Sequence, residues 1–280
     1  MRFKVSAEVE FAVTSASTVL LGIQPFRSEK QRILEEALMA SSPATIREVL
    51  SPVGEKRFNI IELAHTGNIT FSYAGKVEND IQIIPADQLT DVPIASMPVD
   101  VLSLLNPSRY CQSDRLYKLA AHKFGKIDHA FEKVMALRDW IYDNVEYTGG
   151  ITNTQTSAFD TITEQVGVCR DFAHLGVALC RALTIPARYF TGYAYQLNPP
   201  DFHACFEAFL GGHWILFDAT KLVPLNGLIK IATGTDAAET AFASSFGNLN
   251  FQRVEVNVSS LDTTFQPVDA SSTTQGYSVS

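Results

Sequence analysis

The sequence has no apolar run of about 18 residues, the length that a membrane-spanning helix needs. It also lacks the apolar block of a secretory signal peptide, because charged residues are spread through its first ten positions, MRFKVSAEVE. We therefore expect a cytoplasmic protein without membrane contact. With 46% hydrophobic and 19% charged residues among 280, the chain has the composition of a soluble globular protein with a large core.

Basic residues are too few for a nucleic-acid-binding protein. Lys and Arg number 22 against 30 Asp and Glu, a net charge of -8, whereas binding to phosphate backbones needs clustered positive charge. Metal-binding motifs are missing as well, since there is no CxxC pair and no loop of clustered carboxylates. We expect no metal, no cofactor and no nucleic acid. In a reducing cytosol we also expect no disulfide framework from the four cysteines, Cys111, Cys169, Cys180 and Cys205.

Hydrophobic periodicity divides the chain into three parts. Residues 1–100 are predicted to be mostly short strands, as in Phe3–Phe11, where apolar and polar residues alternate. Residues 101–257 carry helices first and strands later. Residues 258–280 are rich in Ser and Thr and poor in apolar residues, which predicts a loosely held tail. Within the first part, residues 31–40 allow either a helix, favoured by their Leu, Glu and Ala content, or a strand, favoured by their surroundings.

Helices and a run of strands are predicted in residues 101–257. Apolar residues at three- and four-residue steps from Phe131 to Val145 mark one amphipathic helix. A second helix begins at Cys169 and is stopped by Pro186. Three strands follow, and the last two are joined by a Gly-Gly hairpin turn: Tyr189–Tyr195, His203–Leu210 and Trp214–Ala219.

The hairpin predicts that a histidine and an aspartate lie together. With a two-residue turn, Leu210 pairs with His213, so that His203 has Asp218 as a diagonal neighbour on the same face of the sheet. An imidazole beside a carboxylate is the arrangement of a general base with its orienting acid.

Cys169 could supply the nucleophile for this pair. A helix N-terminus and a nearby imidazolium both stabilise a thiolate, and free N–H groups at a helix start point to where an oxyanion would form. With His203 as proton carrier and Asp218 as its partner, the set predicts acyl transfer through a thioester. Each residue alone has a more ordinary interpretation, as a core cysteine, a structural histidine or a turn aspartate. The prediction therefore depends on their order and spacing. Cys180, eleven positions after Cys169, is expected in the core.

Three motifs carry a family resemblance: GVCRDFAHL at residues 167–175, HACFEAFL at 203–210 and WILFDAT at 214–220. Together they resemble the transglutaminase-like superfamily of papain-type cysteine enzymes. More narrowly, they are similar to its bacterial branch of candidate cysteine proteases, whose N-terminal domain the first hundred residues resemble.

The resemblance implies an α+β fold. Its papain-like/transglutaminase-like core has the nucleophile helix packed on an antiparallel sheet, and an N-terminal β-rich, sandwich-like domain precedes it. It also implies a triad of Cys169, His203 and Asp218, and it favours a strand for residues 31–40.

Two departures from the family pattern concern the surroundings of the site. Relatives often place Trp two residues after the histidine, where this chain has Cys205, so that a smaller group replaces an aromatic wall. The segment Gly234–Asp236 also lacks the Arg that relatives often place before its aspartate.

Lesser candidates lie near the proposed nucleophile. Gln155 is a candidate side-chain donor to an oxyanion, and Asp171 and Cys205 are candidate pocket residues, although core packing is the ordinary interpretation of Cys205. His174 lies five positions after Cys169, about 140° around the helix, which favours a structural role.

Three functions remain open at this point. Water as the second substrate would make the protein a protease or amidase acting on protein or peptide substrates, and an amine would make it a transglutaminase. We expect hydrolysis, because water is the default acceptor when no amine site is built. The third possibility is a catalytically idle module that binds other proteins, and the presence of all three triad residues argues against it.

Overall fold

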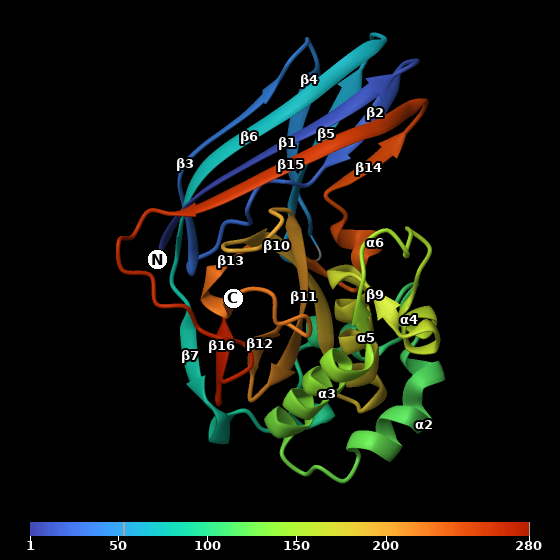
Figure 1. The fold of residues 1–280 in the computed structure, drawn as a ribbon, viewed down its shortest axis with the longest axis vertical. Helices are drawn as coiled ribbons and strands as arrows, with labels where there is room; N and C mark the ends of the chain where they lie inside the picture. Colours follow the sequence, from blue (N-terminus) through green and yellow to red (C-terminus); the bar gives the residue numbers. More distant parts are fainter. Residues whose placement is uncertain (53, 280) are drawn as a thin grey trace.

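Two four-stranded antiparallel sheets form the upper part of the molecule in the computed structural model, which describes residues 1–52 and 54–279 (Figure 1). One sheet has the strand order β15-β1-β6-β3 and the other β14-β2-β5-β4. They enclose a shared apolar core. The strands are β1 (Arg2–Val13), β2 (Ser17–Leu21), β3 (Gln31–Ala40), β4 (Thr45–Leu50), β5 (Arg57–Leu63), β6 (Gly67–Asn79), β14 (Ala243–Phe246) and β15 (Leu249–Ser260).

The alternation along β1 explains why this segment is a strand. Phe3, Val5, Val9 and Phe11 are buried between the sheets, whereas the polar residues between them face outward. The strand predicted for residues 31–40 from the family resemblance is confirmed, since β3 pairs along β6. Helix-forming residues adopt an extended conformation there because the cross-strand ladder outweighs their local preference.

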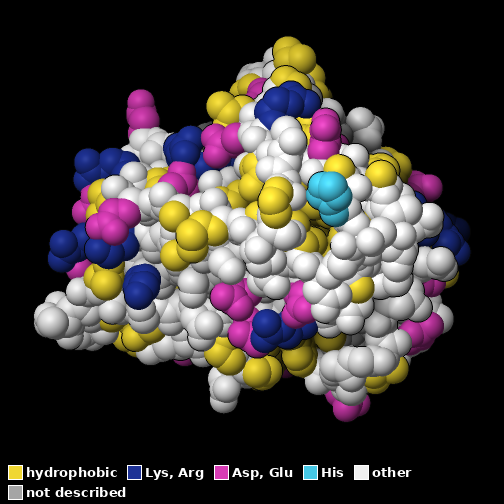
Figure 2. Space-filling model, turned by 90° about the horizontal axis from the view of Figure 1, so that it is seen from above, with side chains coloured by type: hydrophobic (Ala, Val, Ile, Leu, Met, Phe, Trp, Pro, Cys, Tyr) yellow, Lys and Arg dark blue, Asp and Glu magenta, His cyan; other side chains and the backbone are white. Residues whose placement is uncertain are grey.

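Acidic and basic side chains lie next to one another on the upper face, with hydrophobic side chains in separate patches between them (Figure 2). Ion pairs across neighbouring strands account for part of this pattern. Arg253 on β15, for example, places Nε 3.1 Å from a carboxylate oxygen of Glu10 on β1. Such exposed pairs contribute little to stability and keep the surface polar.

A third four-stranded sheet, with the order β12-β11-β10-β13, forms the lower part, and helices cover one of its faces (Figure 1). Helix α5 packs directly on β10 and β11 and is buried from Asp171 to Ala182. The helix comes very close to the sheet at Gly176. A Cβ on this residue would lie within 2.5 Å of the Phe206 ring, so glycine is needed there. The elements are α2 (Ser113–Phe124), α3 (Ala130–Asn144), α4 (Ala158–Glu164), α5 (Cys169–Ala182), β10 (Ala187–Ala194), β11 (Phe202–Leu210), β12 (His213–Phe217) and β13 (Leu228–Gly234).

This arrangement confirms the predicted α+β class, in which one central helix packs on an antiparallel sheet. No helix in the described part of the chain is long and apolar enough to cross a membrane. The shorter elements are β7 (Gln82–Pro85), η1 (Ala86–Gln88), η2 (Ile94–Ser96), α1 (Val99–Leu102), η3 (Ser103–Leu105), β8 (Glu146–Tyr147), β9 (Val166–Gly167), η4 (Leu225–Gly227), α6 (Ala237–Thr240) and β16 (Gln275–Ser278).

The chain returns to the upper sheets after it has built the lower one. Strand β14 pairs with β2, and β15 pairs along almost the whole of β1. The upper part therefore contains residues 243–260 in addition to strands β1 to β6, whereas β7 and the segment after it lie beside the lower sheet. Ion pairs also join the two parts: Glu55 lies 3.0 Å from Nη2 of Arg188 and contacts the ammonium group of Lys230.

The last residues are not the loose tail that their Ser/Thr content predicts. Strand β16 pairs with β7, nearly 200 positions earlier in the chain, and the side chains of Tyr277 and Val279 are buried. These two apolar residues join a core cluster that includes Leu216 and Val223. Their burial outweighs the polar composition around them, which is why the expectation was wrong for this segment. Residue 280 lies outside the described residues.

Candidate active site

Cys169 is the first residue of α5, and a capping interaction fixes the turn that leads into it. Asp171, completely buried, accepts a hydrogen bond from the backbone N–H of Val168 at 3.0 Å. Gly167 leaves room for this carboxylate, because a Cβ there would lie 2.7 Å from Cβ of Asp171. Asp171, a candidate pocket residue from the sequence, thus holds the helix start and is not among the residues that line the cavity beside Cys169.

His203 and Asp218 meet as the predicted hairpin register requires. Leu210 pairs with His213, which places His203 on β11 opposite the end of β12. Nε2 of His203 lies 3.1 Å from Oδ2 of Asp218, and both side chains are shielded from solvent. The other carboxylate oxygen accepts hydrogen bonds from the backbone N–H of Thr220 at 2.8 Å and from its hydroxyl at 2.7 Å. The carboxylate is therefore held from two sides.

The electrostatics of this pair favour the charged form of both partners. Burial alone lowers the pKa of His203, but the Asp218 carboxylate more than offsets it and raises the pKa well above 6.5. Burial alone raises the pKa of Asp218, but His203 and the Thr220 hydrogen bonds more than offset it and bring the pKa below 3.8. An imidazolium beside a carboxylate is the state that results.

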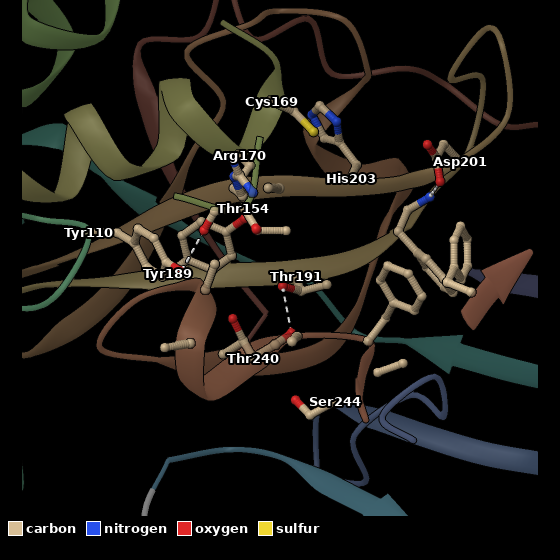
Figure 3. A pocket seen from close by; sticks show the side chains of 18 of the residues that line it. Tyr110, Thr154, Cys169, Arg170, Tyr189, Thr191, Asp201, His203, Thr240 and Ser244 are labelled. Carbon is tan, nitrogen blue, oxygen red and sulfur yellow. Dashed lines mark hydrogen bonds between the residues drawn. The ribbon is translucent and has the colours of Figure 1, made fainter. Parts of the chain in front are cut away.

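The thiol of Cys169 faces the ring of His203 from α5 (Figure 3). Nδ1 of His203 is buried and makes no hydrogen bond of ordinary geometry to any described residue. Cys169 is half-buried, whereas the other cysteines are buried. Burial raises the pKa of Cys111 and Cys205 to about 12, and it raises the pKa of Cys180 further.

Tyr147 is a neighbour of Cys169 that reasoning from residue spacing did not single out. Strand β8 runs parallel to β9 and pairs Tyr147 with Gly167, two residues before the cysteine. Burial and the adjacent Cys169 thiol raise the pKa of Tyr147 to about 12, and hydrogen bonding to the backbone N–H of Cys169 opposes this rise. The phenol group therefore lies at the helix start. The available sequence signal was the Tyr147-Thr148 pair directly before Gly149 and Gly150.

A cavity of about 620 Å³ opens beside Cys169 and His203 (Figure 3). Its walls come from both parts of the molecule. Figure 3 shows Cys169 and His203 on one side of it and Ser244, from β14, on the opposite side. Aromatic residues make up much of the lining: Tyr110, Tyr189, Phe202, Phe242, Phe11 and Phe251.

The remaining candidates from the sequence fall outside this cavity. Gln155 lies in an exposed loop, where its backbone N–H donates to Oδ1 of Asn153 at 2.8 Å, and it borders a separate polar hollow. Cys205 is 1% exposed and lies behind the histidine: its sulfur, an imidazole nitrogen of His203 and a carboxylate oxygen of Asp218 all lie within 4.8 Å of one another. These three residue types can hold a metal ion, but the histidine and carboxylate already bind each other.

His174 has the structural role that its position on the helix predicts. Its ring stacks against Tyr110 at 5.0 Å and contacts Tyr189 at 4.8 Å between centroids. Nε2 accepts a hydrogen bond from the backbone N–H of Ala237 at 3.2 Å. Burial lowers the pKa of His174 well below 6.5, so that the ring is neutral. The histidine supports two tyrosines that line the cavity.

Family models match both parts of the chain. Residues 117–219 match the model of the transglutaminase-like superfamily, and residues 1–100 match that of the bacterial transglutaminase N-terminal domain. Among solved structures, the chain is similar to "a Putative Cysteine Protease from Cytophaga hutchinsonii". The two are 51% identical, with a TM-score of 0.96, over 100% of this chain and 98% of that one.

Curated relatives are more distant. An uncharacterised protein from Mycobacterium leprae (strain TN) is 26% identical over 188 residues, which are 63% of this chain and 67% of that protein. Another, from Mycobacterium tuberculosis (strain H37Rv), is 33% identical over 96 residues, so that the matched part is 34% of this chain and 30% of the relative.

Proposed function

The chain belongs to the transglutaminase-like superfamily, and we propose that it is a cysteine-dependent enzyme that hydrolyses amide bonds of proteins or peptides. The observation that carries the proposal is the buried contact between His203 and Asp218, with the Cys169 thiol on the other side of the imidazole and a cavity beside it. The solved relative's description as a protease favours the same class.

In the proposed first half-reaction, the Cys169 thiolate attacks the amide carbon and forms a carbon–sulfur bond. The carbon–nitrogen bond breaks, and the departing amine takes a proton from His203. Asp218 holds the imidazole in place and stabilises its charged form. The hydrogen bonds that Thr220 donates to Asp218 fix the carboxylate in the orientation for this role. The product is a thioester on Cys169.

In the second half-reaction, water attacks the thioester while His203 accepts its proton. The carbon–sulfur bond breaks, the acid leaves and the thiolate is restored. If an amine attacked in place of water, the same thioester would give a new amide bond, and the enzyme would be a transglutaminase. Hydrolysis is the default because it needs no second binding site.

The negative charge on the attacked oxygen needs donors at the start of α5. The backbone N–H of Cys169 belongs to the first turn, whose N–H groups have no partner within the helix. The Tyr147 hydroxyl, which hydrogen-bonds this N–H in the absence of substrate, is the proposed second donor, and the attacked oxygen would take its place as acceptor of the N–H. Gln155, the candidate from the sequence, borders a separate polar hollow and is replaced in this role.

The test is a comparison of wild type with Cys169→Ala on unfolded casein and on peptide amides, with a fluorescent primary amine present. Mass spectrometry separates new carboxyl ends from incorporated amine. We expect cleavage by wild type and none by Cys169→Ala, whereas Cys111→Ala, which removes a cysteine outside the cavity, retains it. If the fluorescent amine is incorporated and no new carboxyl ends appear, the proposed reaction is cross-linking and not hydrolysis. Absence of both products, together with no hydroxylamine-sensitive acyl-enzyme, would favour the idle binding module.

A further inference from the structure

Four phenylalanine rings form a row that runs from His203 into the upper sheets. Phe202, the residue before His203, stacks with Phe242 at 5.4 Å between centroids. Phe242 meets Phe251 edge-on at 6.0 Å, and Phe251 meets Phe11 at 6.1 Å. All four line the candidate active-site cavity. We call these four residues the aromatic row.

The aromatic row is open to solvent over part of its length. Phe251 is 50% exposed, Phe202 and Phe242 are partly exposed, and Phe11 is buried beneath them. Large apolar side chains that stay accessible in a concave site are typical of a ligand-binding surface. A cavity of about 620 Å³ falls within the usual range for such sites and holds one bulky side chain together with adjacent peptide backbone.

Two hydroxyl groups on another wall of the cavity already have partners. The Tyr110 hydroxyl donates to the carbonyl of Thr154 at 2.7 Å, and the Thr191 hydroxyl donates to the carbonyl of Thr240 at 3.3 Å (Figure 3). Hydroxyls engaged in this way offer little to a polar side chain of a ligand, because an existing hydrogen bond would have to be exchanged. These two hydroxyls do not compete with the aromatic row in selecting a substrate.

The charged side chains at the cavity do not favour an acidic substrate either. Nη2 of Arg170 lies 3.2 Å from Oδ1 of Asp171, which offsets its charge, and also contacts the carbonyl of Asn153, while its Nε is buried without a hydrogen-bond partner among the described residues. Asp201 borders the aromatic row and accepts the backbone N–H of Phe202 at 2.7 Å. Burial raises the pKa of Asp201, and its carboxyl group offers no positive charge to an acidic side chain of a substrate.

We propose that the substrate carries a bulky aromatic side chain next to the scissile amide, and that this side chain binds against Phe202, Phe242 and Phe251. The inference rests on the proposed amide hydrolysis and names its substrate class. It also gives the upper sheets a role, because β1 and β15 supply Phe11 and Phe251 to the site.

The first experiment uses fluorogenic peptide amides that differ at one residue beside the scissile bond: Phe, Leu, Ala, Lys or Glu, on either side of it. We expect kcat/KM to be highest for Phe and at least about 10-fold lower for Ala, because the loss of one large apolar contact reduces kcat/KM by about that factor. Glu should be the poorest substrate. A flat ranking, or a preference for Glu, would overturn the inference while leaving amide hydrolysis in place.

The second experiment shortens one ring and uses a matched control. Phe251→Ala should lower kcat/KM about 10-fold for the Phe substrate, mainly through KM, and should leave the Ala substrate unchanged. Phe246→Ala removes an exposed phenylalanine of neighbouring β14 that does not line the cavity, and it should change neither substrate. An equal loss on both substrates in Phe251→Ala would mean that the ring only supports the fold, which contradicts the inference.

A binding measurement separates this inference from the proposed reaction. Cys169→Ala protein is titrated with N-acetyl-phenylalanine amide and N-acetyl-glutamate amide peptides, with and without Phe251→Ala. Selective binding of the aromatic peptide that is lost in the double variant supports the inference even if wild type cleaves nothing. Equal binding of both peptides overturns it whether or not cleavage occurs.

Discussion

Nε2 of His203, on β11, lies 3.1 Å from Oδ2 of Asp218, which directly follows β12, and both side chains are out of contact with solvent. Both side chains are buried, so neither can readily exchange its partner for water. In the proposed reaction this contact orients the imidazole toward Cys169, and its loss should appear in the rate of the chemical step.

Asp218→Asn should reduce kcat by roughly 10³- to 10⁴-fold with little change in KM, because an amide supports neither the tautomer nor the charge of His203. Steady-state kinetics on the best peptide amide measure this, and thermal unfolding reports whether the fold survives. Thr220→Ser, which keeps the hydroxyl that donates to Asp218, is the control and should remain within a few-fold of wild type. An Asp218→Asn enzyme that keeps its kcat would remove Asp218 from the mechanism.

Alkylation should distinguish Cys169 from the other cysteines. Burial raises the pKa of Cys111 and Cys205 to about 12 and that of Cys180 further, so these thiols stay protonated and covered. At pH 6 to 7 we expect iodoacetamide to modify Cys169 alone, as read by peptide mass spectrometry.

The same experiment on His203→Ala tests whether the imidazole activates the thiol. The rate at Cys169 should fall by at least about 10-fold in this variant, because the stabilising positive charge is gone. An unchanged rate at Cys169 in His203→Ala would argue for the idle module. Equal labelling of Cys169 and Cys111 in wild type would argue for it as well.

The contact between His203 and Asp218 could be predicted from the sequence because it depends on a local feature. Gly211 and Gly212 adopt φ values of 57° and 85°, which suit glycine in a two-residue hairpin turn. Once the turn is set, the period of two along each strand determines which side chains share a face. The helix after Gly167 was predictable for a similar reason, since its apolar positions repeat at the helical period.

Contacts between distant segments could not be predicted in this way. Strand β15 reaches β1, and β16 reaches β7, through pairings that no local pattern encodes, so the aromatic row and the burial of Tyr277 emerge only in the fold. Loop direction was a second obstacle. Gln155 is close to Cys169 along the chain, but it borders a different hollow, whereas its neighbour Thr154 lines the cavity. The supporting role of Asp171 depends on the side-chain conformation at a helix cap, which spacing alone does not determine.

His174 should make the folded protein less stable in mild acid. Burial lowers the pKa of His174 well below 6.5, so the unfolded chain binds a proton below that pH that the folded chain refuses. The free energy of unfolding should therefore fall as the pH falls below about 6.5, by up to about 1.4 kcal/mol per pH unit from this residue.

Urea unfolding between pH 4.5 and 8 measures this dependence in wild type, His174→Phe and the control His122→Asn, which replaces an exposed histidine on α2. The acid-side slope should be smaller in His174→Phe by the contribution of one proton and unchanged in His122→Asn. Parallel curves for all three proteins would show that His174 is not a neutral buried group.

Tyr147→Phe should slow catalysis by on the order of 10²-fold if the hydroxyl donates to the oxyanion. The effect should fall on kcat, with KM nearly constant, because the donor acts on charge that develops only in the transition state. Phe keeps the ring contact with Phe172, at 5.7 Å between centroids, so the fold around α5 should be undisturbed. Tyr142→Phe removes a hydroxyl from an exposed tyrosine of α3 and is the matched control.

Since the phenol lies beside the Cys169 thiol as well as its N–H group, it could instead cover the nucleophile in the resting enzyme. In that case Tyr147→Phe would raise the alkylation rate of Cys169 and leave kcat intact, a result that would assign the oxyanion to backbone donors alone.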